Sequence, residues 1–230
     1  MQYAFCSNSI DKNIGTALLS SGVDVISVPA SPRLPFPTCS HADMLMFKAD
    51  DNTWIMEKET YEKLHFIPPN IQIITDTFDA EHDLEYPYDI RFNAALIAGF
   101  LFCREKYISP LIIKNTKAKI VDVKQGYAKC SMCMVDDHAF ITSDPSLKKA
   151  GDKCGLDVLL ISPGHIRLDG YNYGFIGGAS ALLDKNLFFF GNIRLHPDYP
   201  KIHDFIYKRN IREIILSQST LYDYGGMLFV

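Results

Sequence analysis

Two short stretches of this chain carry side chains that could do acid–base or nucleophilic chemistry. The first is His41-Ala42-Asp43. If this stretch begins a strand, residues i and i+2 lie on one face, so the imidazole and the carboxylate point the same way. Such a pair could move protons at a bound substrate. The structural alternative is a loop histidine beside an aspartate that caps a strand.

The second stretch is Lys129-Cys130-Ser131. The positive charge of Lys129 would favour the reactive thiolate of Cys130, so this thiol is the candidate nucleophile. The alternative is an inert buried cysteine, which is common. Cys130 and Cys133 have the spacing of a redox pair, but positions i and i+3 of a strand point to opposite faces. No second ligand pair for zinc is found, and we expect neither a metal nor a cofactor.

Further polar residues stand where other strands are expected to start. Functional sites generally collect on loops that a rigid scaffold holds in place, so we expect these residues to surround one pocket. The candidate catalytic residues are Cys130 and His41. The candidate substrate-binding residues are Asp43, Arg91, Asn93, Lys129, Ser131 and Asp223.

The elements that would position these residues recur along the chain as a β-β-α-β unit. The last strand of each unit is a short run of β-branched and aliphatic residues, typical of strands covered by helices. These runs are 24–28, 71–75, 119–123, 157–161 and 213–217. Helical segments that end at Gly, Pro or Asn precede four of the runs. They are 12–21, 59–65, 145–153 and 199–209, while 107–117 is a weaker helix because it contains Pro110.

The first strand of each unit ends in apolar residues. These strands are expected at 41–47, 91–97, 129–135, 177–183 and 224–230. The N-terminal segment would supply the rest of the last unit, because Ala4-Phe5-Cys6-Ser7 resembles Ala139-Phe140-Ile141-Thr142. A chain whose two ends complete one repeat is most simply a closed ring, since closure hides strand edges. We expect one domain over 1–230, with repeats at about 221–230 plus 1–30, 41–76, 91–124, 129–162 and 175–218.

Composition narrows the classes of function. Hydrophobic residues make up 47% of the chain and charged residues 22%, as in ordinary globular proteins with a sizeable core. A formal net charge of -4 gives no basic footprint for nucleic acid. The first residues lack a signal-peptide pattern, and the longest apolar run, 92–103, is too short to span a bilayer. Six cysteines without a secretory signal predict reduced thiols and a cytoplasmic protein.

Five β-β-α-β units in a ring resemble the pentein, or α/β-propeller, superfamily, and within it the sequence is most similar to an uncharacterised bacterial domain family. The superfamily contains guanidino-group-modifying enzymes and a non-catalytic ribosome anti-association factor. His41-x-Asp43 is similar to the start of a His-x-Asp-x-x-Phe motif of the arginine-deiminase-like enzymes, and Phe47 stands one residue later than the Phe of that motif. The resemblance implies an α/β fold of five-fold pseudo-symmetry, with His41 as acid and base and Asp43 paired with a guanidino group. An α/β sandwich of unrelated topology is the alternative fold.

The resemblance breaks at the nucleophile. The enzymes of the superfamily place a catalytic cysteine shortly after a Gly-Gly pair. Here Gly225-Gly226 is followed by Met227-Leu228-Phe229-Val230, which contains no thiol. At the other pair, Gly177-Gly178, Ile176 and Ala179 stand where the family carries Glu and Asp. Cys130 is therefore the only candidate replacement.

Two hypotheses about function follow. In the first, the protein is a thiol-dependent hydrolase or transferase that acts on an amidino or guanidino compound, with Asp43 and Asp223 holding the cation. In the second, it is a non-catalytic binding module for a small ligand or a protein partner. The missing thiol after Gly226 favours the binding module, and the cluster of His41, Asp43, Lys129 and Cys130 favours the enzyme. We expect a small molecule in a central pocket, a cation under the first hypothesis, while the second leaves a protein partner open. Neither hypothesis involves nucleic acid or a membrane.

Overall fold

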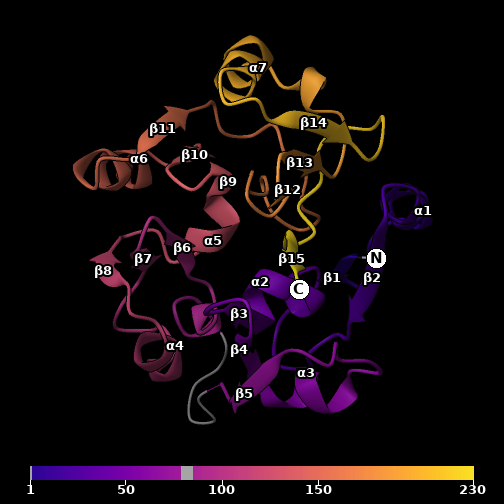
Figure 1. Cartoon of the computed structure of the whole chain (residues 1–230), viewed down its shortest axis with the longest axis vertical. Helices are drawn as coiled ribbons and strands as arrows, with labels where there is room; N and C mark the ends of the chain where they lie inside the picture. The colour runs from indigo at the N-terminus through magenta and orange to yellow at the C-terminus, as the bar shows by residue number, and fades with distance from the viewer. Residues whose placement is uncertain (1, 79–84) are drawn as a thin grey trace.

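The computed structural model describes residues 2–78 and 85–230, which form five small sheets around a common centre (Figure 1). Each sheet has three strands. The inner strands are β15 (Met227–Phe229), β3 (Met46–Lys48), β6 (Ala95–Ile97), β9 (Cys133–Asp136) and β12 (Ser180–Leu183). The middle strands are β1 (Gln2–Ser7), β4 (Thr53–Glu57), β7 (Phe100–Cys103), β10 (Ala139–Thr142) and β13 (Asn186–Phe189). The outer strands are β2 (Val23–Val28), β5 (Gln72–Asp76), β8 (Lys119–Asp122), β11 (Asp157–Leu160) and β14 (Arg212–Ile215).

All five sheets share one topology. The inner and middle strands are antiparallel, and the middle and outer strands are parallel. A helix joins each pair of parallel strands, as a crossover connection requires. These helices are α1 (Lys12–Ser20), α3 (Lys58–Lys63), α4 (Pro110–Asn115), α6 (Pro145–Lys153) and α7 (Tyr199–Tyr207). The predicted β-β-α-β repeat is confirmed. The segment 107–117, which the sequence predicts as a weaker helix, contains α4.

Side-chain caps fix where four of these helices begin. Asp11, Glu57, Ser109 and Asp144 each accept a hydrogen bond from a backbone N–H of the first turn. Pro110 is the first residue of α4. Proline is tolerated there because the N–H of a first-turn residue has no partner within its helix. The residue that weakens the sequence signal is therefore compatible with the helix.

The first and last strands of the chain lie in one sheet. β15 pairs antiparallel with β1, with Ala4 opposite Phe229 and Cys6 opposite Met227. This pairing confirms that the last strand joins the N-terminal strands of the first repeat. Each sheet of the described chain stops at three strands, so the repeats are joined by packing and by loops rather than by one continuous sheet.

The starts of the inner strands differ from the sequence prediction. We expected strands over 41–47 and 129–135, but the helical turns α2 (Ala42–Leu45) and α5 (Ala128–Ser131) come first. Only the apolar ends of these segments are extended, as β3 and β9. All four residues of α2 are buried. A helical turn lets such a buried segment satisfy backbone groups without a neighbouring strand.

Aromatic pairs pack between neighbouring sheets. Phe5 of β1 lies against Trp54 of β4, with ring centroids 5.2 Å apart. Phe102 of β7 and Phe140 of β10 are 6.0 Å apart in an edge-to-face arrangement. All four rings are fully buried, and aromatic side chains bury a large apolar surface each. The apolar core therefore lies between the sheets.

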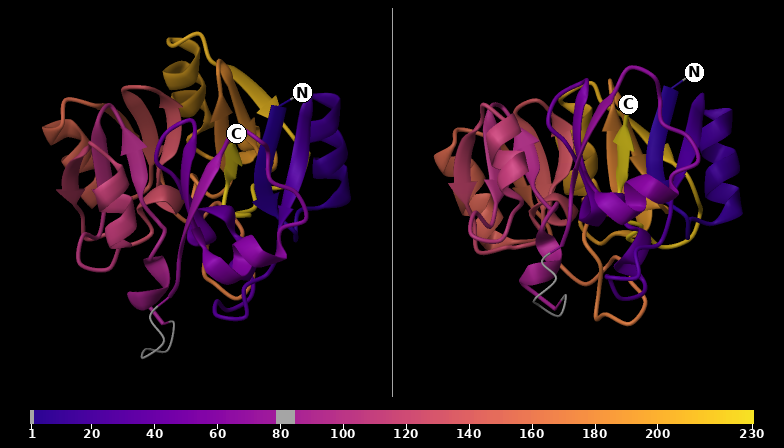
Figure 2. Two further views of the ribbon diagram at one scale, coloured as in Figure 1. Left: turned by 60° about the horizontal axis from the view of Figure 1, so that its bottom comes forward. Right: turned by 90° about the horizontal axis from the view of Figure 1, so that it is seen from below.

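The two ends of the molecule differ. Figure 2 shows both termini toward one end, which we call the terminal end. The loops at 30–41 and 163–178, which precede inner strands, extend toward the other end, which we call the loop end. None of the helices in the described part of the chain is both long and apolar enough to cross a membrane.

Candidate functional site

A central pocket of about 260 Å³ is built from the loops at the loop end. Each of the five repeats contributes at least one lining residue, because the loop before every inner strand reaches the centre. The lining residues are Thr38, His41, Met44, Asp89, Tyr127, Cys130, Leu168, Tyr171, Asn172, Tyr173, Phe175 and Asp223. The pocket thus brings together the predicted residues His41, Cys130 and Asp223, which lie far apart in the sequence.

A circuit of hydrogen bonds runs around this pocket from repeat to repeat. Its backbone part starts at α5, where Gly178 N donates to Cys130 O at 2.9 Å. Gly226 N then donates to Gly178 O at 2.7 Å, and Asp43 N donates to Gly225 O at 3.3 Å. These bonds link four of the five repeats and leave one gap.

The side chain of Asn93 closes the gap. Its Nδ2 donates to Asp43 O at 3.0 Å, and its Oδ1 accepts from Lys129 N at 2.8 Å, which returns the circuit to α5. Asn93 is completely buried. The same Nδ2 lies 2.9 Å from Cys130 Sγ. Asn93 therefore positions both the Asp43 turn and the thiol.

Glycines make room for the pocket's acidic and imidazole side chains. A Cβ on Gly178 would overlap the carboxylate of Asp223, and a Cβ on Gly225 would overlap His41. Gly225 also has φ +75°, a conformation that favours glycine. In the enzymes of the superfamily a Gly-Gly pair precedes the catalytic cysteine. In this chain Gly178 and Gly225 instead leave room for the side chains of Asp223 and His41.

His41 and Asp223 form a buried pair. His41 Nδ1 lies 3.8 Å from Asp223 Oδ1. The carboxylate also accepts hydrogen bonds from Phe175 N at 2.8 Å and Gly225 N at 3.0 Å. Burial raises the pKa of Asp223 to about 6, although the charge of His41 and these hydrogen bonds lower it. His41 Nε2 is buried and has no hydrogen-bond partner among the described residues, so it is available to a ligand.

Cys130 lies in α5 and not at the mouth of a strand. Burial raises the pKa of its thiol well above 9.0, and the nearby carboxylates of Asp43 and Asp223 raise it further, while the hydrogen bond from Asn93 lowers it. This corrects the expectation that Lys129 would favour the thiolate. The thiol in the pocket is protonated at neutral pH, because the charges around it are negative.

Asp43 is buried beside the thiol. Neither Oδ1 nor Oδ2 accepts a hydrogen bond from an N–H or O–H group in the described part of the chain, and the neighbouring Cys130 thiol is hydrogen-bonded to this carboxylate. We expected His41 and Asp43 to lie on one face of a strand. Instead, His41 is the N-cap residue of α2 and Asp43 lies in its first turn. A buried carboxylate without N–H or O–H donors is costly.

Asp89 and an aromatic wall were missed by the sequence reasoning. Asp89 is buried, its Oδ2 accepts a hydrogen bond from the Tyr127 hydroxyl at 2.6 Å, and its Oδ1 has no partner among the described residues. Burial raises the pKa of Asp89, although the Tyr127 bond lowers it. Tyr171, Tyr173 and Phe175 form the wall. These three aromatic residues occupy alternate positions of one loop, a sequence pattern that indicates a shared aromatic surface.

Five of the six predicted substrate-binding residues, all except Asp223, lie outside the lining of the central pocket. Asp43 and Asn93 are buried and both contact Cys130, which does line it. Arg91 donates two hydrogen bonds of 3.0 Å to Asp76, a bidentate ion pair. The side chain of Lys129 lines a separate hollow at the terminal end. Ser131 is buried, and its Oγ has no partner among the described residues. In the described chain no group of three or more His, Cys, Asp and Glu residues could hold a metal ion.

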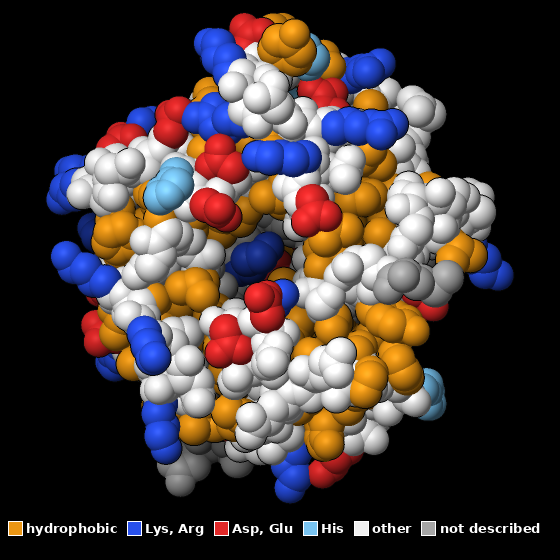
Figure 3. Space-filling view, in the orientation of Figure 1, with side chains coloured by type: hydrophobic (Ala, Val, Ile, Leu, Met, Phe, Trp, Pro, Cys, Tyr) orange, Lys and Arg blue, Asp and Glu red, His pale blue; other side chains and the backbone are white. Residues whose placement is uncertain are grey.

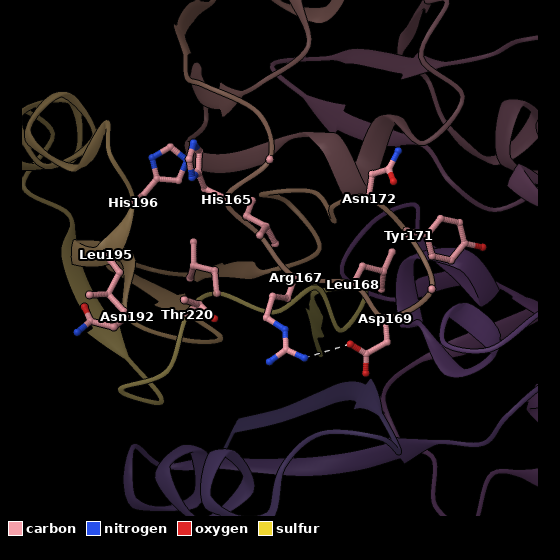
Figure 4. Close-up of a pocket in the computed structure, with 14 residues that line it drawn as sticks. His165, Arg167, Leu168, Asp169, Tyr171, Asn172, Asn192, Leu195, His196 and Thr220 are labelled. Atoms are coloured by element: carbon pink, nitrogen blue, oxygen red, sulfur yellow. Dashed lines mark hydrogen bonds and ion pairs between the residues drawn. The ribbon is translucent and has the colours of Figure 1, made fainter.

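A second pocket of about 460 Å³ adjoins the first, and Leu168, Tyr171 and Asn172 line both. Figure 4 shows His165 and His196 side by side at one end of this pocket and the Arg167–Asp169 ion pair at the other. The loop that carries the aromatic wall therefore separates two cavities.

Comparisons with known proteins identify the fold. A profile of the family described as "Family of unknown function (DUF6873)" matches residues 5–228. Comparison with the curated proteins finds no match. Among solved structures, a cysteine-to-serine mutant of DDAH from Pseudomonas aeruginosa, complexed with citrulline, has a TM-score of 0.58 and 9% identity, covering 100% of this chain and 99% of that chain. A dimethylarginine dimethylaminohydrolase adduct with 4-chloro-2-hydroxymethylpyridine has a TM-score of 0.53 and 10% identity, covering 94% and 92%.

An amidinotransferase from Microseira wollei in the saxitoxin biosynthetic pathway has a TM-score of 0.53 and 10% identity, covering 99% of this chain and 93% of that chain. These likenesses confirm the predicted resemblance to the pentein superfamily. At such low identity they show the fold alone, so the roles of residues depend on the geometry of this chain.

Replacing Asn93 should destabilise the protein through the circuit. We expect Asn93→Ala to lower the free energy of unfolding by about 2–4 kcal/mol, because it leaves Lys129 N and Asp43 O without partners and opens a cavity. Urea denaturation measures the change. Asn172→Ala is the matched control, since Asn172 is exposed, and it should stay within about 0.5 kcal/mol of the wild type. Equal effects of the two substitutions would contradict the role of the circuit.

The raised pKa of Asp223 predicts a pH dependence of stability. Between pH 4 and about 6 the folded state holds a proton that the unfolded chain releases, so this group's contribution to stability falls as pH rises. Asp223→Asn should remove that contribution, on the order of 2 kcal/mol across the window. Urea denaturation of both proteins from pH 4 to 7 measures the difference in slope. Parallel pH profiles would show that Asp223 titrates normally.

Proposed function

Because the chain belongs to DUF6873, a family of unknown function, we propose its function from its own central pocket: it binds a small guanidino or amidino cation and acts on it through the thiol of Cys130. The class of reaction is hydrolysis or group transfer at the amidino carbon. One observation carries the proposal. The buried carboxylate of Asp43 receives no N–H or O–H hydrogen bond in the described chain, and it lies next to the Cys130 thiol that lines the pocket.

A planar cation with two parallel N–H donors matches this carboxylate. Guanidinium and amidinium groups can donate two hydrogen bonds to one carboxylate, and such charge-assisted pairs are stronger than neutral ones. The unpaired Asp89 Oδ1 offers another acceptor, and Asp223 adds negative charge. The rings of Tyr171, Tyr173 and Phe175 can receive the face of a delocalised cation. The pocket thus favours a small cation over a neutral or anionic ligand.

The reaction can be written with the residues that line the pocket. The Cys130 thiol loses its proton to His41, and the sulfur forms a bond to the amidino carbon. His41 returns the proton to the leaving nitrogen as the C–N bond breaks, which releases an amine or ammonia. Water, or an acceptor amine in a transferase, then gives its proton to His41 and attacks the carbon. The C–S bond breaks, the thiolate is reprotonated, and a ureido product or a transferred amidino group results.

The bound cation would also change the state of the nucleophile. Without a ligand, Asp43 and Asp223 hold the pKa of Cys130 high. A guanidinium against Asp43 replaces a negative neighbour with a neutral pair, and this lowers the pKa of the thiol. The thiolate would therefore form chiefly when a substrate is present, which limits oxidation and alkylation of the free protein.

A non-catalytic binding module is the second candidate. The observation in its favour is that Cys130 is nearly fully buried and protonated, while the segment after Gly226 carries no thiol. The structural neighbour complexed with citrulline supports a small ligand of related shape under either candidate. Both candidates share the cation pocket and differ in whether the amidino carbon is attacked.

Further proposals concern the whole chain. We propose a single domain over 1–230, closed into a ring because β15 and β1 from the two ends of the chain pair within one repeat. We also propose a cytoplasmic location, because all six cysteines are free thiols, as expected in a reducing compartment.

The first test measures the thiolate of Cys130. We expect ultraviolet absorbance to show titration above pH 9 in the free protein and a lower apparent pKa with methylguanidine, with Cys130→Ser as the reference for subtraction. Asp43→Asn should lower the pKa of Cys130 without ligand, because it removes a negative neighbour, and should abolish the response to methylguanidine. If methylguanidine neither binds nor shifts the titration of the wild type, the cation pocket is refuted.

The second test separates the enzyme from the binding module. We expect a series of guanidino compounds to include one that the wild type converts to a ureido or transferred product, detected by mass spectrometry. Cys130→Ser should abolish conversion, whereas Cys133→Ser, at a buried thiol outside the pocket lining, should retain it. Binding of guanidino compounds without any conversion, with water or with acceptor amines, would decide for the binding module.

A further inference from the structure

A second central cavity lies at the terminal end, opposite the cation pocket. Its volume is about 490 Å³, within the range of small-molecule sites. All five inner strands, β3, β6, β9, β12 and β15, contribute to its walls. Figure 3 shows this hollow at the centre of the molecule, with a basic side chain deep inside and acidic side chains near its rim. We call it the terminal hollow, and the function proposed above does not use it.

The charged group inside the terminal hollow is Lys129. Its side chain is half-buried, and no hydrogen bond or ion pair joins Nζ to another residue that the structure describes. Nζ lies close to Gly226, where a Cβ would come within 3.6 Å of it. Lys48, the other lysine of the lining, is satisfied by Phe229 O at 3.1 Å and by Asp51 at 3.2 Å. Lys129 therefore offers up to three unused donors and one unbalanced positive charge.

The walls around this ammonium are apolar and adaptable. Four methionines line the hollow, Met46, Met132, Met134 and Met227. Methionine side chains are flexible and polarisable, and they adjust to irregular apolar ligands. Leu96 of β6 also lines the hollow and is 37% exposed, an accessible apolar contact. A ligand that reaches Lys129 must therefore pass apolar surface, which favours an aliphatic stem.

The rim sets the charge of the ligand. Asp50, Asp51 and Asp137 lie in the turns between inner and middle strands, and all three are exposed. Their negative field disfavours ligands of high negative charge, such as dianionic phosphates, while the single unpaired ammonium can balance one charge. We propose that the terminal hollow binds a small aliphatic monocarboxylate, with the carboxylate on Lys129 Nζ and the stem against the methionines.

Methyl NMR of the whole protein tests this site with defined probes. We would label the methionine methyl groups and titrate with sodium pentanoate, pentylamine, pentanol and inorganic phosphate. Pentanoate should shift the methyl signals of the four lining methionines, whereas pentylamine and pentanol should bind at least about tenfold more weakly, because they lack the charge-assisted bond to Lys129. Inorganic phosphate that binds more tightly than pentanoate would overturn the assignment to a monocarboxylate.

Three variants test the role of Lys129. Lys129→Met should weaken pentanoate binding about ten- to a hundredfold, and Lys129→Arg should retain most of it. Lys117→Met removes one positive charge at an exposed position outside the hollow and should bind as the wild type does. Unchanged binding by Lys129→Met would refute the site. If that variant does not fold, the wild-type preference for pentanoate over pentylamine and pentanol decides, and no preference refutes the site.

Discussion

The hydrogen-bond circuit around the axis is the constraint on which the rest of the structure depends. It passes through backbone groups of four repeats and through one side chain, Asn93, before it returns to α5. Because each bond fixes the loop before one inner strand, the circuit sets where the residues of all five repeats meet. It also explains why small residues are needed beside it: any side chain at Gly178 would displace Asp223 from the position that the circuit defines.

Buried carboxyl groups gather at and next to the central pocket, where Asp223 lines it and Asp43 lies beside Cys130. Asp43 and Asp223 raise the pKa of Cys130, and burial raises the pKa of Asp223 itself. Buried carboxyl groups with unpaired oxygens reduce stability unless a partner satisfies them. Functional sites are where such conflicts are retained, because a ligand resolves them. The fold supports this arrangement through apolar contacts between sheets, and one apolar cluster reaches the pocket through Met44 and Cys130.

The sequence predicted the repeat and the helices well, because apolar runs and terminal stop signals are local properties of the chain. α6 matches its expected range, and β15 pairs with the N-terminal strand as the internal similarity suggested. The conformation before each inner strand could not be predicted in this way. In the helical turns that carry Asp43 and Cys130, hydrogen bonds to other repeats satisfy backbone groups. Such long-range hydrogen bonds produce no periodic pattern in the sequence. For the same reason Lys129 was placed in the wrong cavity and Asp89 was missed.

The single turn of α5 has a consequence for how the two ends of the molecule communicate. Its neighbouring residues Lys129 and Cys130 face different cavities, and Asn93 holds the backbone of one and the sulfur of the other. A displacement of either side chain would therefore move the peptide group that joins Lys129 to Cys130. Any energetic coupling between occupants of the two cavities must be reciprocal: each would change the affinity for the other by the same factor.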